Sequence, residues 1–212
     1  MIVFDLECAP FRVEELTEIQ KKYIQKKVLA AVKRDPDVDQ LAKERELRGT
    51  DPFLSRIVCI GLFYPKTGQT LALTNDDEKL ILESFWQNIS SFRGTFISYN
   101  GIKFDVPYII RRSIHHGIKP TNHIFLQHTK FNPMPAHFDV MIQISAGKEQ
   151  FYSLHEACEF FGVDSSKLGG IVAAEVGDAY YAGRIQEIAD YCLRDLQATY
   201  QLYEKVKVFI QN

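Results

Sequence analysis

The middle of this 212-residue chain reads Ser98-Tyr99-Asn100-Gly101-Ile102-Lys103-Phe104-Asp105-Val106-Pro107. Residues 95–98 predict a short strand, and the Asn100-Gly101 pair predicts a tight turn directly after it. Residues 104–116 predict a helix, whose first turn then holds Asp105. An asparagine-glycine turn followed at this spacing by phenylalanine, aspartate and proline rarely arises by chance. This stretch is therefore the most specific signal in the sequence, and it indicates an α/β fold.

Two further acidic motifs lie near the ends of the chain. The first apolar run, which predicts a strand, ends in Phe4-Asp5-Leu6-Glu7, and a long predicted helix contains Ala189-Asp190-Tyr191-Cys192-Leu193-Arg194-Asp195. Alternate side chains of a strand share one face, so Asp5 and Glu7 point the same way. Residues four apart on a helix share a face, and so do Tyr191 and Asp195. We expect the three elements to bring four acids and one tyrosine into a single cleft.

Four clustered carboxylates need a counter-charge, because like charges a few ångströms apart cannot all stay ionised. Divalent cations provide it, and carboxylate oxygens suit Mg²⁺ or Mn²⁺. Two such ions about 3.5–4 Å apart can activate a water and stabilise the leaving oxygen of an in-line displacement. The sequence therefore predicts metal-assisted hydrolysis of a phosphodiester, with two metal ions held by Asp5, Glu7, Asp105 and Asp195.

At these residues the sequence resembles the 3′→5′ exonucleases of the DEDD superfamily, and within it the DEDDy subgroup, which carries a tyrosine in the third motif. It is most similar to the exonuclease domain of B-family DNA polymerases. The resemblance runs from residue 2 to about residue 203, apart from residues 10 to about 52. It implies a ribonuclease H-like fold, a mixed five-stranded sheet flanked by helices. It also implies stepwise hydrolysis of a single-stranded or frayed 3′ end, DNA favoured, that releases nucleoside 5′-monophosphates.

The resemblance also implies roles for individual residues. It implies that four acids bind metal and are catalytic: Asp5, Glu7, Asp105 and Asp195. Tyr191, the fifth catalytic residue, would orient the attacking water or help to deprotonate it. Among substrate-binding residues, Asn100 would lie near the terminal nucleotides and Phe104 would support the site. Asp139 matches a family position behind the cleft and is expected to be structural.

The remaining sequence predicts the other elements of a mixed sheet. Residues 55–64 and 69–73 predict a hairpin with Pro, Lys, Thr and Gly at its turn, and residues 75–89 predict a helix. Residues 117–137 are rich in proline, asparagine and histidine, which is typical of a loop. Only residues 137–142 could supply another strand.

A helical insertion is expected after the first strand, at residues 10–55, within a single domain that comprises residues 1–212. The segment is charged and reads as helical, and Pro36 should end one helix and permit another. It matches nothing in the family, and three roles stay open. It could clamp the substrate strand, dock a protein partner or cover an edge of the sheet.

Local charge indicates where nucleic acid could bind, because the net charge of −2 gives no global attraction. Residues 106–138 contain no aspartate or glutamate. They predict a phosphate-binding surface, with Arg111 and Arg112 as substrate contacts. A polar loop is the plainer interpretation. The basic stretch at residues 21–34 is more simply a solvated helix face, because acidic residues follow at once.

Other features set limits on location and on function class. No apolar run approaches the roughly 20 residues that cross a bilayer, so no membrane association is expected. The first residues lack the basic region of a signal peptide. Four scattered cysteines indicate neither zinc fingers nor disulfides, which favours a reducing cytoplasm.

Three alternative functions stay open. A 3′→5′ exoribonuclease would use the same metal chemistry, which does not inspect the 2′-hydroxyl. A catalytically silent nucleic-acid-binding or docking module would be expected to lose an acid, yet all four are present. A zinc site built on the histidines is the weakest idea, because their spacing repeats no ligand pattern.

Overall fold

The computed structural model describes residues 1–126, 136–145, 152–164 and 170–210. One five-stranded sheet has the strand order β3-β2-β1-β4-β5. Its strands are β1 (Ile2–Pro10), β2 (Ser55–Tyr64), β3 (Gln69–Thr74), β4 (Phe96–Ser98) and β5 (His137–Asp139). β1, β2 and β3 pair antiparallel, whereas β4 pairs parallel with both β1 and β5. The mixed five-stranded sheet predicted from the sequence is confirmed.

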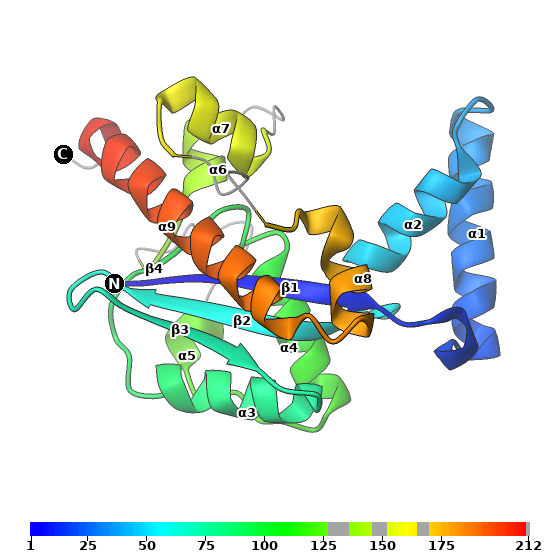
Figure 1. Cartoon of the computed structure of the whole chain (residues 1–212), viewed down its shortest axis with the longest axis horizontal. Helices are drawn as coiled ribbons and strands as arrows, with labels where there is room; N and C mark the ends of the chain where they lie inside the picture. Colours follow the sequence, from blue (N-terminus) through cyan, green and yellow to red (C-terminus); the bar gives the residue numbers. More distant parts are fainter. Residues whose placement is uncertain (127–135, 146–151, 165–169, 211–212) are drawn as a thin grey trace.

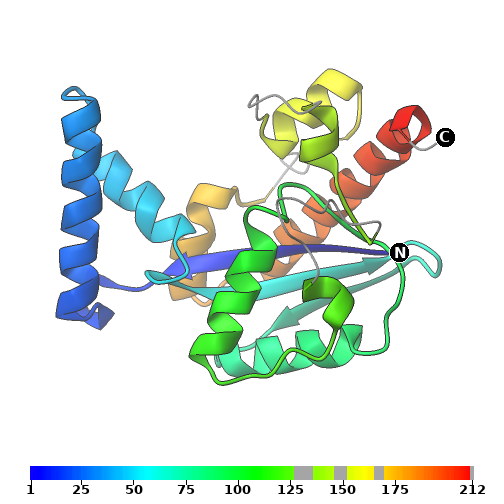
Figure 2. The ribbon, with the colours of Figure 1, turned by 180° about the vertical axis from the view of Figure 1, so that it is seen from behind.

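Helices cover both faces of this sheet (Figure 1, and from behind in Figure 2). On one face lie α3 (Glu78–Ile89), α4 (Asp105–His115) and α5 (His123–Leu126). On the other lie α9 (Ile185–Ile210), α6 (Val140–Ile144), α7 (Leu154–Phe161), the short 3-10 helix Ala173–Glu175 and α8 (Val176–Tyr181). No helix in the described ranges is long and apolar enough to span a membrane.

The alternation of β1 explains how the two layers separate. Phe4 and Leu6 join the aromatic core beneath α3 and α4. Val3 joins the core beneath α9 instead. Because side chains two apart on a strand share a face, Asp5 and Glu7 lie on the α9 side together with Val3. The layer that holds α9 therefore also holds the first acidic motif.

The predicted helical insertion is an arm that leaves the end of β1 and returns at the start of β2 (Figure 1). The arm comprises the 3-10 helix Val13–Glu15, α1 (Glu18–Arg34) and α2 (Gln40–Thr50). Thr17 begins α1 with a capping box, and Asp39 caps α2 through its carboxylate. The two helices pack on each other, and α2 also packs on β1. A small apolar core joins the arm to the main body: Leu16, Ile24, Val28 and Leu54.

The structure refines the expectation at three places. β1 continues to Pro10, because β2 pairs with it as far as Ser55. The candidate strand at residues 137–142 ends at Asp139, whose carboxylate accepts the N–H of Ile142 and so begins α6. The predicted loop at residues 117–137 holds the single-turn helix α5 within its described part, residues 117–126 and 136–137.

Candidate active site

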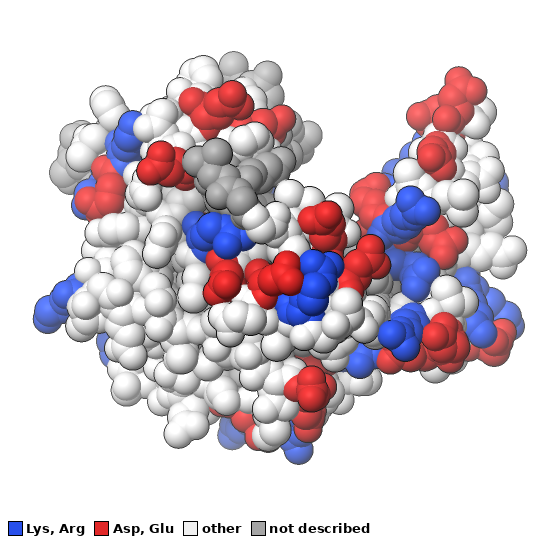
Figure 3. All heavy atoms as spheres, in the orientation of Figure 1, with Lys and Arg blue, Asp and Glu red and all other residues white. Residues whose placement is uncertain are grey.

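The acids and the tyrosine of the three motifs line one cavity. The cavity has a volume of about 1240 Å³ and lies among β1, the start of α4, α8, α9 and α2. Its lining includes all five residues expected to be catalytic: Asp5, Glu7, Asp105, Tyr191 and Asp195. Asn100 and Phe104 line it as well. Figure 3 shows charged side chains of both signs around the hollow between the main body and the arm. We call this space the acidic cavity.

β1 directs Asp5 and Glu7 toward α9. Leu6, between them, packs into the opposite core. The pairing of β1 with β2 shifts register between Glu7 and Cys8, and bulges of this kind commonly re-aim side chains beside active sites. Glu7 is only 8% exposed, whereas Asp5 is half-buried. The two carboxylates therefore face the acidic cavity from the sheet.

The turn after β4 places Asp105 beside β1. Asn100 has a φ of 64°, in the left-handed region that asparagine tolerates better than most residues. The Asp139 carboxylate accepts the N–H groups of Asn100 and Ile102, at 3.0 and 2.9 Å, and so holds the turn. The Asp105 carboxylate then accepts the N–H of Leu6 at 3.0 Å. This bond fixes the second motif directly to the first, and Asp139 is structural as expected.

Close packing of α9 on β2 brings the third motif to the same place. Gly61 of β2 lies opposite Asp5 in the sheet. A Cβ atom at Gly61 would lie 2.7 Å from Cys192 Sγ and 2.8 Å from Leu196 Cδ1. Glycine therefore lets α9 approach the sheet at the level of Asp5. Tyr191 and Asp195, on neighbouring turns of α9, reach the cavity because of this approach.

Burial and crowding leave the acidic cluster short of positive charge. Desolvation is the largest cause that raises the pKa of Asp5 and of Glu7 well above their ordinary values, and neighbouring carboxylates add to it. Burial likewise raises the pKa of Asp105 to about 7. A divalent cation in the cavity would favour the charged form of each carboxyl group. This set of hard oxygen donors fits Mg²⁺ or Mn²⁺.

The Tyr191 hydroxyl is held in its protonated form. Burial raises its pKa far above the ordinary value, and the charge of Asp195 raises it further. Tyr191 is 7% exposed, and it lines the acidic cavity on the same helix face as Asp195. A neutral hydroxyl in this position can donate or accept a hydrogen bond. It is suited to orient a water molecule, and less suited to deprotonate one.

Among the described residues, one compact group of potential metal ligands combines two carboxylates with the sulfur of Cys192. Donor atoms of Asp5, Glu7 and Cys192 all lie within 4.8 Å of one another. A hydrogen bond with Cys59 and burial raise the pKa of the Cys192 thiol, so it stays protonated. The histidines of the described ranges form no such group. The zinc alternative therefore gains no support.

The two arginines expected to contact substrate lie elsewhere. Arg112 is buried beneath α3, where its guanidinium pairs with both carboxylate oxygens of Glu78 and donates to the Pro52 carbonyl at 3.1 Å. Arg111 is exposed on α4 and does not line the acidic cavity. The prediction of a substrate contact is thus wrong for Arg112, because the buried Glu78 carboxylate needs this cation. For Arg111 the structure gives no support.

The sequence did not reveal the residues that the arm contributes to the cavity lining. The start and the end of the arm contribute several of them: Phe11, Arg12, Arg45, Arg48 and Thr50. Their signal in the sequence is weak, since they belong to a charged helical segment without a recognisable motif. Gly61 was missed as well. Its only signal is a glycine inside a predicted strand, which often marks close approach of another backbone or helix.

Comparison with known proteins identifies the family. Residues 53–212 match the family described as predicted 3′-5′ exonucleases related to the exonuclease domain of PolB. The chain belongs to this exonuclease family. The matched part contains Asp105, Tyr191 and Asp195, whereas Asp5, Glu7 and nearly all of the arm precede it. Membership implies a nucleic-acid substrate and metal use.

A solved structure has the same fold as this exonuclease family member. The family B DNA polymerase from the hyperthermophilic archaeon Pyrobaculum calidifontis matches with a TM-score of 0.68 at 16% sequence identity. The match covers 98% of this chain and 24% of the polymerase, so the chain spans about a quarter of that protein's length. At this identity, the similarity establishes the fold alone. No curated protein matches the sequence.

Proposed function

We propose that the protein is a two-metal-ion 3′→5′ exonuclease. It hydrolyses the terminal phosphodiester of a single-stranded or frayed 3′ end, with DNA favoured over RNA, and releases nucleoside 5′-monophosphates. One observation carries the proposal: four carboxylates from three distant segments line one cavity, together with the tyrosine of the third motif. The raised pKa values of Asp5, Glu7 and Asp105 support it. In a site that binds cations, the ionised form of clustered carboxyl groups is unfavourable as long as no cation is bound.

The metal ions would be held by the four carboxylates Asp5, Glu7, Asp105 and Asp195. When bound, divalent cations supply Lewis-acid stabilisation of the charge that develops on the cleaved phosphate. The protein fixes the ligands in advance through local anchors, such as the Leu6 N–H that holds Asp105. Preorganised charge of this kind needs little rearrangement at the moment of reaction.

The other cavity residues would orient the reactants. The protonated Tyr191 hydroxyl holds the attacking water by a hydrogen bond, and burial, together with the Asp195 carboxylate beside it, raises its pKa and keeps that hydroxyl neutral. Asn100 and Phe104 line the cavity next to Asp105, where the terminal nucleotide would lie. The Phe104 ring is braced by Tyr108, with ring centroids 5.4 Å apart. Together these residues would position the last phosphodiester over the carboxylates.

A digestion assay tests the proposal. 5′-labelled single-stranded DNA and a matched RNA of the same sequence are incubated with the protein and Mn²⁺ or Mg²⁺. We expect a ladder of stepwise shortened DNA, nucleoside 5′-monophosphates as the released product, and no reaction in EDTA. If neither nucleic acid is shortened, the proposed function is wrong. Faster digestion of RNA would move the assignment to an exoribonuclease.

Matched variants of one helix test the site. Asp195→Asn should lower the rate by more than about 10²-fold, the scale of losing one electrostatic contact in the transition state. Asp190→Asn is the control, because Asp190 is exposed on the same helix and bonds only to Gln186 among the described residues. We expect it to keep the wild-type rate. An active Asp195→Asn enzyme would show that the site is assigned wrongly, even if the protein is a nuclease.

A further inference from the structure

Within the part of the chain that the structure describes, the arm supplies the positive charge in the lining of the acidic cavity. Among the described residues of the lining, the lysines and arginines are Arg12, Arg45 and Arg48, and all three lie between β1 and β2. The main body contributes carboxylates, and the arm adds those of Glu14 and Glu46. Residues 53–212, which match the exonuclease family, supply acids and no lysine or arginine to the described lining, whereas the segment before them supplies the three arginines and also Asp5 and Glu7.

Two hydrogen bonds fix α2 against the strand that carries the acids. The Cys8 thiol, directly after Glu7, donates to the Gly49 carbonyl at 2.9 Å. The Arg48 guanidinium donates to the Phe11 carbonyl at 2.6 Å, just past the end of β1. The C-terminal end of α2 is therefore held beside the first acidic motif. Its distance from the carboxylates is set by the fold and does not depend on a flexible loop.

Arg45 is an arginine of the cavity lining whose side chain is free to bind a ligand. It lies four residues before Gly49, so it occupies the same helix face about one turn away, roughly 6 Å along the axis. It is exposed and lines the acidic cavity. It forms no ion pair or hydrogen bond with any residue that the structure describes.

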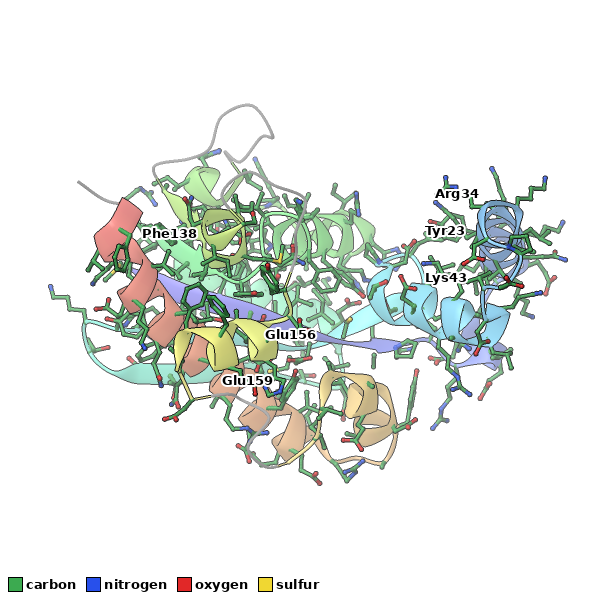
Figure 4. All side chains as sticks on the ribbon, turned by 90° about the horizontal axis from the view of Figure 1, so that it is seen from above. Tyr23, Arg34, Lys43, Phe138, Glu156 and Glu159 are labelled. Carbon is green, nitrogen blue, oxygen red and sulfur yellow. The ribbon has the colours of Figure 1, made fainter. Side chains whose placement is uncertain are left out.

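The charged neighbours of Arg45 within α2 already have partners. The Arg48 guanidinium lies 3.6 Å from the Glu44 carboxylate and also donates a hydrogen bond to the Phe11 carbonyl. Lys43 binds both carboxylate oxygens of Glu46, at 2.8 and 2.9 Å. Figure 4 shows α2, with Lys43 labelled, beside the strand that carries the first acidic motif. Arg12 stacks over the Tyr181 ring, 4.2 Å from its centroid. Glu44 and Glu46, the acids on either side of Arg45 in α2, are therefore engaged by Arg48 and Lys43.

We propose that Arg45 binds a backbone phosphate of the single-stranded substrate, upstream of the nucleotide being removed. This inference rests on the proposed exonuclease function, and it adds a substrate contact on α2 to those of the catalytic residues. The cavity, at about 1240 Å³, exceeds the roughly 300–1,000 Å³ of small-molecule pockets, so it has room for more than one nucleotide. A cation in the lining of the same cavity as the acids would hold the strand by its charge, without reading its sequence.

Binding measured without catalysis tests the inference. A fluorescein-labelled oligothymidylate of 20 nucleotides is titrated in EDTA with wild-type protein, Arg45→Ala and Arg34→Ala. Arg34 is the control, because it is an exposed arginine of the same arm that does not line the cavity. We expect Arg45→Ala to raise the Kd about tenfold, the effect of one charge-assisted contact. The slope of log Kd against log salt should fall by about 0.7, as for one phosphate on a single strand.

Kinetics of the active enzyme locate the contact along the strand. With Mn²⁺, Arg45→Ala should raise KM for the 20-mer about tenfold at unchanged kcat, and it should leave cleavage of a dinucleotide unchanged. Equal Kd values for the Arg45 and Arg34 variants would overturn the inference, and so would an equal loss on the dinucleotide. A wild-type protein that binds the oligonucleotide through Arg45 but never shortens it would refute the exonuclease function and keep the binding site.

Discussion

Replacing Gly61 with alanine tests how the sheet positions the catalytic helix. The new methyl group would lie 2.7 Å from Cys192 Sγ and 2.8 Å from Leu196 Cδ1. Both of those residues are fully buried, so neither side chain can turn into solvent to make room. Ordinary contacts between such atoms are about 3.5–4.0 Å. We therefore expect α9 to move away from β2 by about 0.7 Å or more.

The structure gives a magnitude for both effects of this change. Overpacking of a tight core costs about 1–3 kcal/mol of unfolding free energy. A misplacement of about 1 Å in a catalytic group can cost about 10²-fold in rate. Because Tyr191 and Asp195 lie on α9 and move with it, we expect Gly61→Ala to lower the rate of hydrolysis by up to about 10²-fold. The Asp5 carboxylate, opposite Gly61, would keep its place on the strand.

Urea unfolding measures the loss of stability, and the exonuclease assay measures the loss of rate. Gly49→Ala is the control for stability, because a Cβ at this helical glycine meets no atom within 4 Å. It should be neutral or stabilising by up to about 1 kcal/mol, the difference in helix propensity. Wild-type stability in Gly61→Ala would refute the close packing. A destabilised variant with wild-type rate would refute the claim that this packing positions the site.

Three further variants test single hydrogen-bonding groups. Tyr191→Phe should lower kcat about tenfold at unchanged KM, since one hydrogen bond to water is lost. Asp139→Ala should cost about 1–3 kcal/mol, because part-buried N–H groups of Asn100 and Ile102 lose their acceptor. Glu78→Gln should destabilise the fold by about 3–5 kcal/mol at pH 7, because Arg112 is left buried without its charged partner.

Each of these variants has a measurement that can contradict it. The Tyr191 variant is followed by steady-state kinetics, and a raised KM at unchanged kcat would oppose an orienting role. The other two are followed by urea unfolding, and wild-type stability would oppose the assigned bonds. For Glu78 the sign with pH is also fixed. Burial opposes ionisation, but Arg112 outweighs it and lowers the folded pKa below 4.5. The advantage of wild type over Glu78→Gln should therefore be complete above pH 4.5 and fade as pH falls further.

The convergence of the three motifs could be predicted because it follows from local geometry. The two-residue period of a strand places Asp5 and Glu7 on one face, and the turn of a helix aligns Tyr191 with Asp195. Asp105 follows from a strand, a turn and a helix start. Only the docking of these elements is long-range, and the mixed sheet settles it by pairing β1 with both β2 and β4.

The basic residues could not be assigned because their roles depend on distant partners. Arg112 looks like a surface cation of a basic stretch, yet Glu78, 34 residues away, draws it into the core. Arg45 looks like one charge among many on a polar helix. It acquires its proposed role only because α2 folds back against β1 beside Glu7. Sequence patterns report which face a residue occupies, and they do not report what that face meets.

A crystal structure of the protein soaked in Mn²⁺ tests the central claim most directly. Anomalous scattering locates manganese without reference to the protein model. The account predicts two manganese peaks in the acidic cavity, in contact with the carboxylates of Asp5, Glu7, Asp105 and Asp195. An absence of peaks among these four carboxylates, in crystals that bind Mn²⁺ elsewhere, would contradict it.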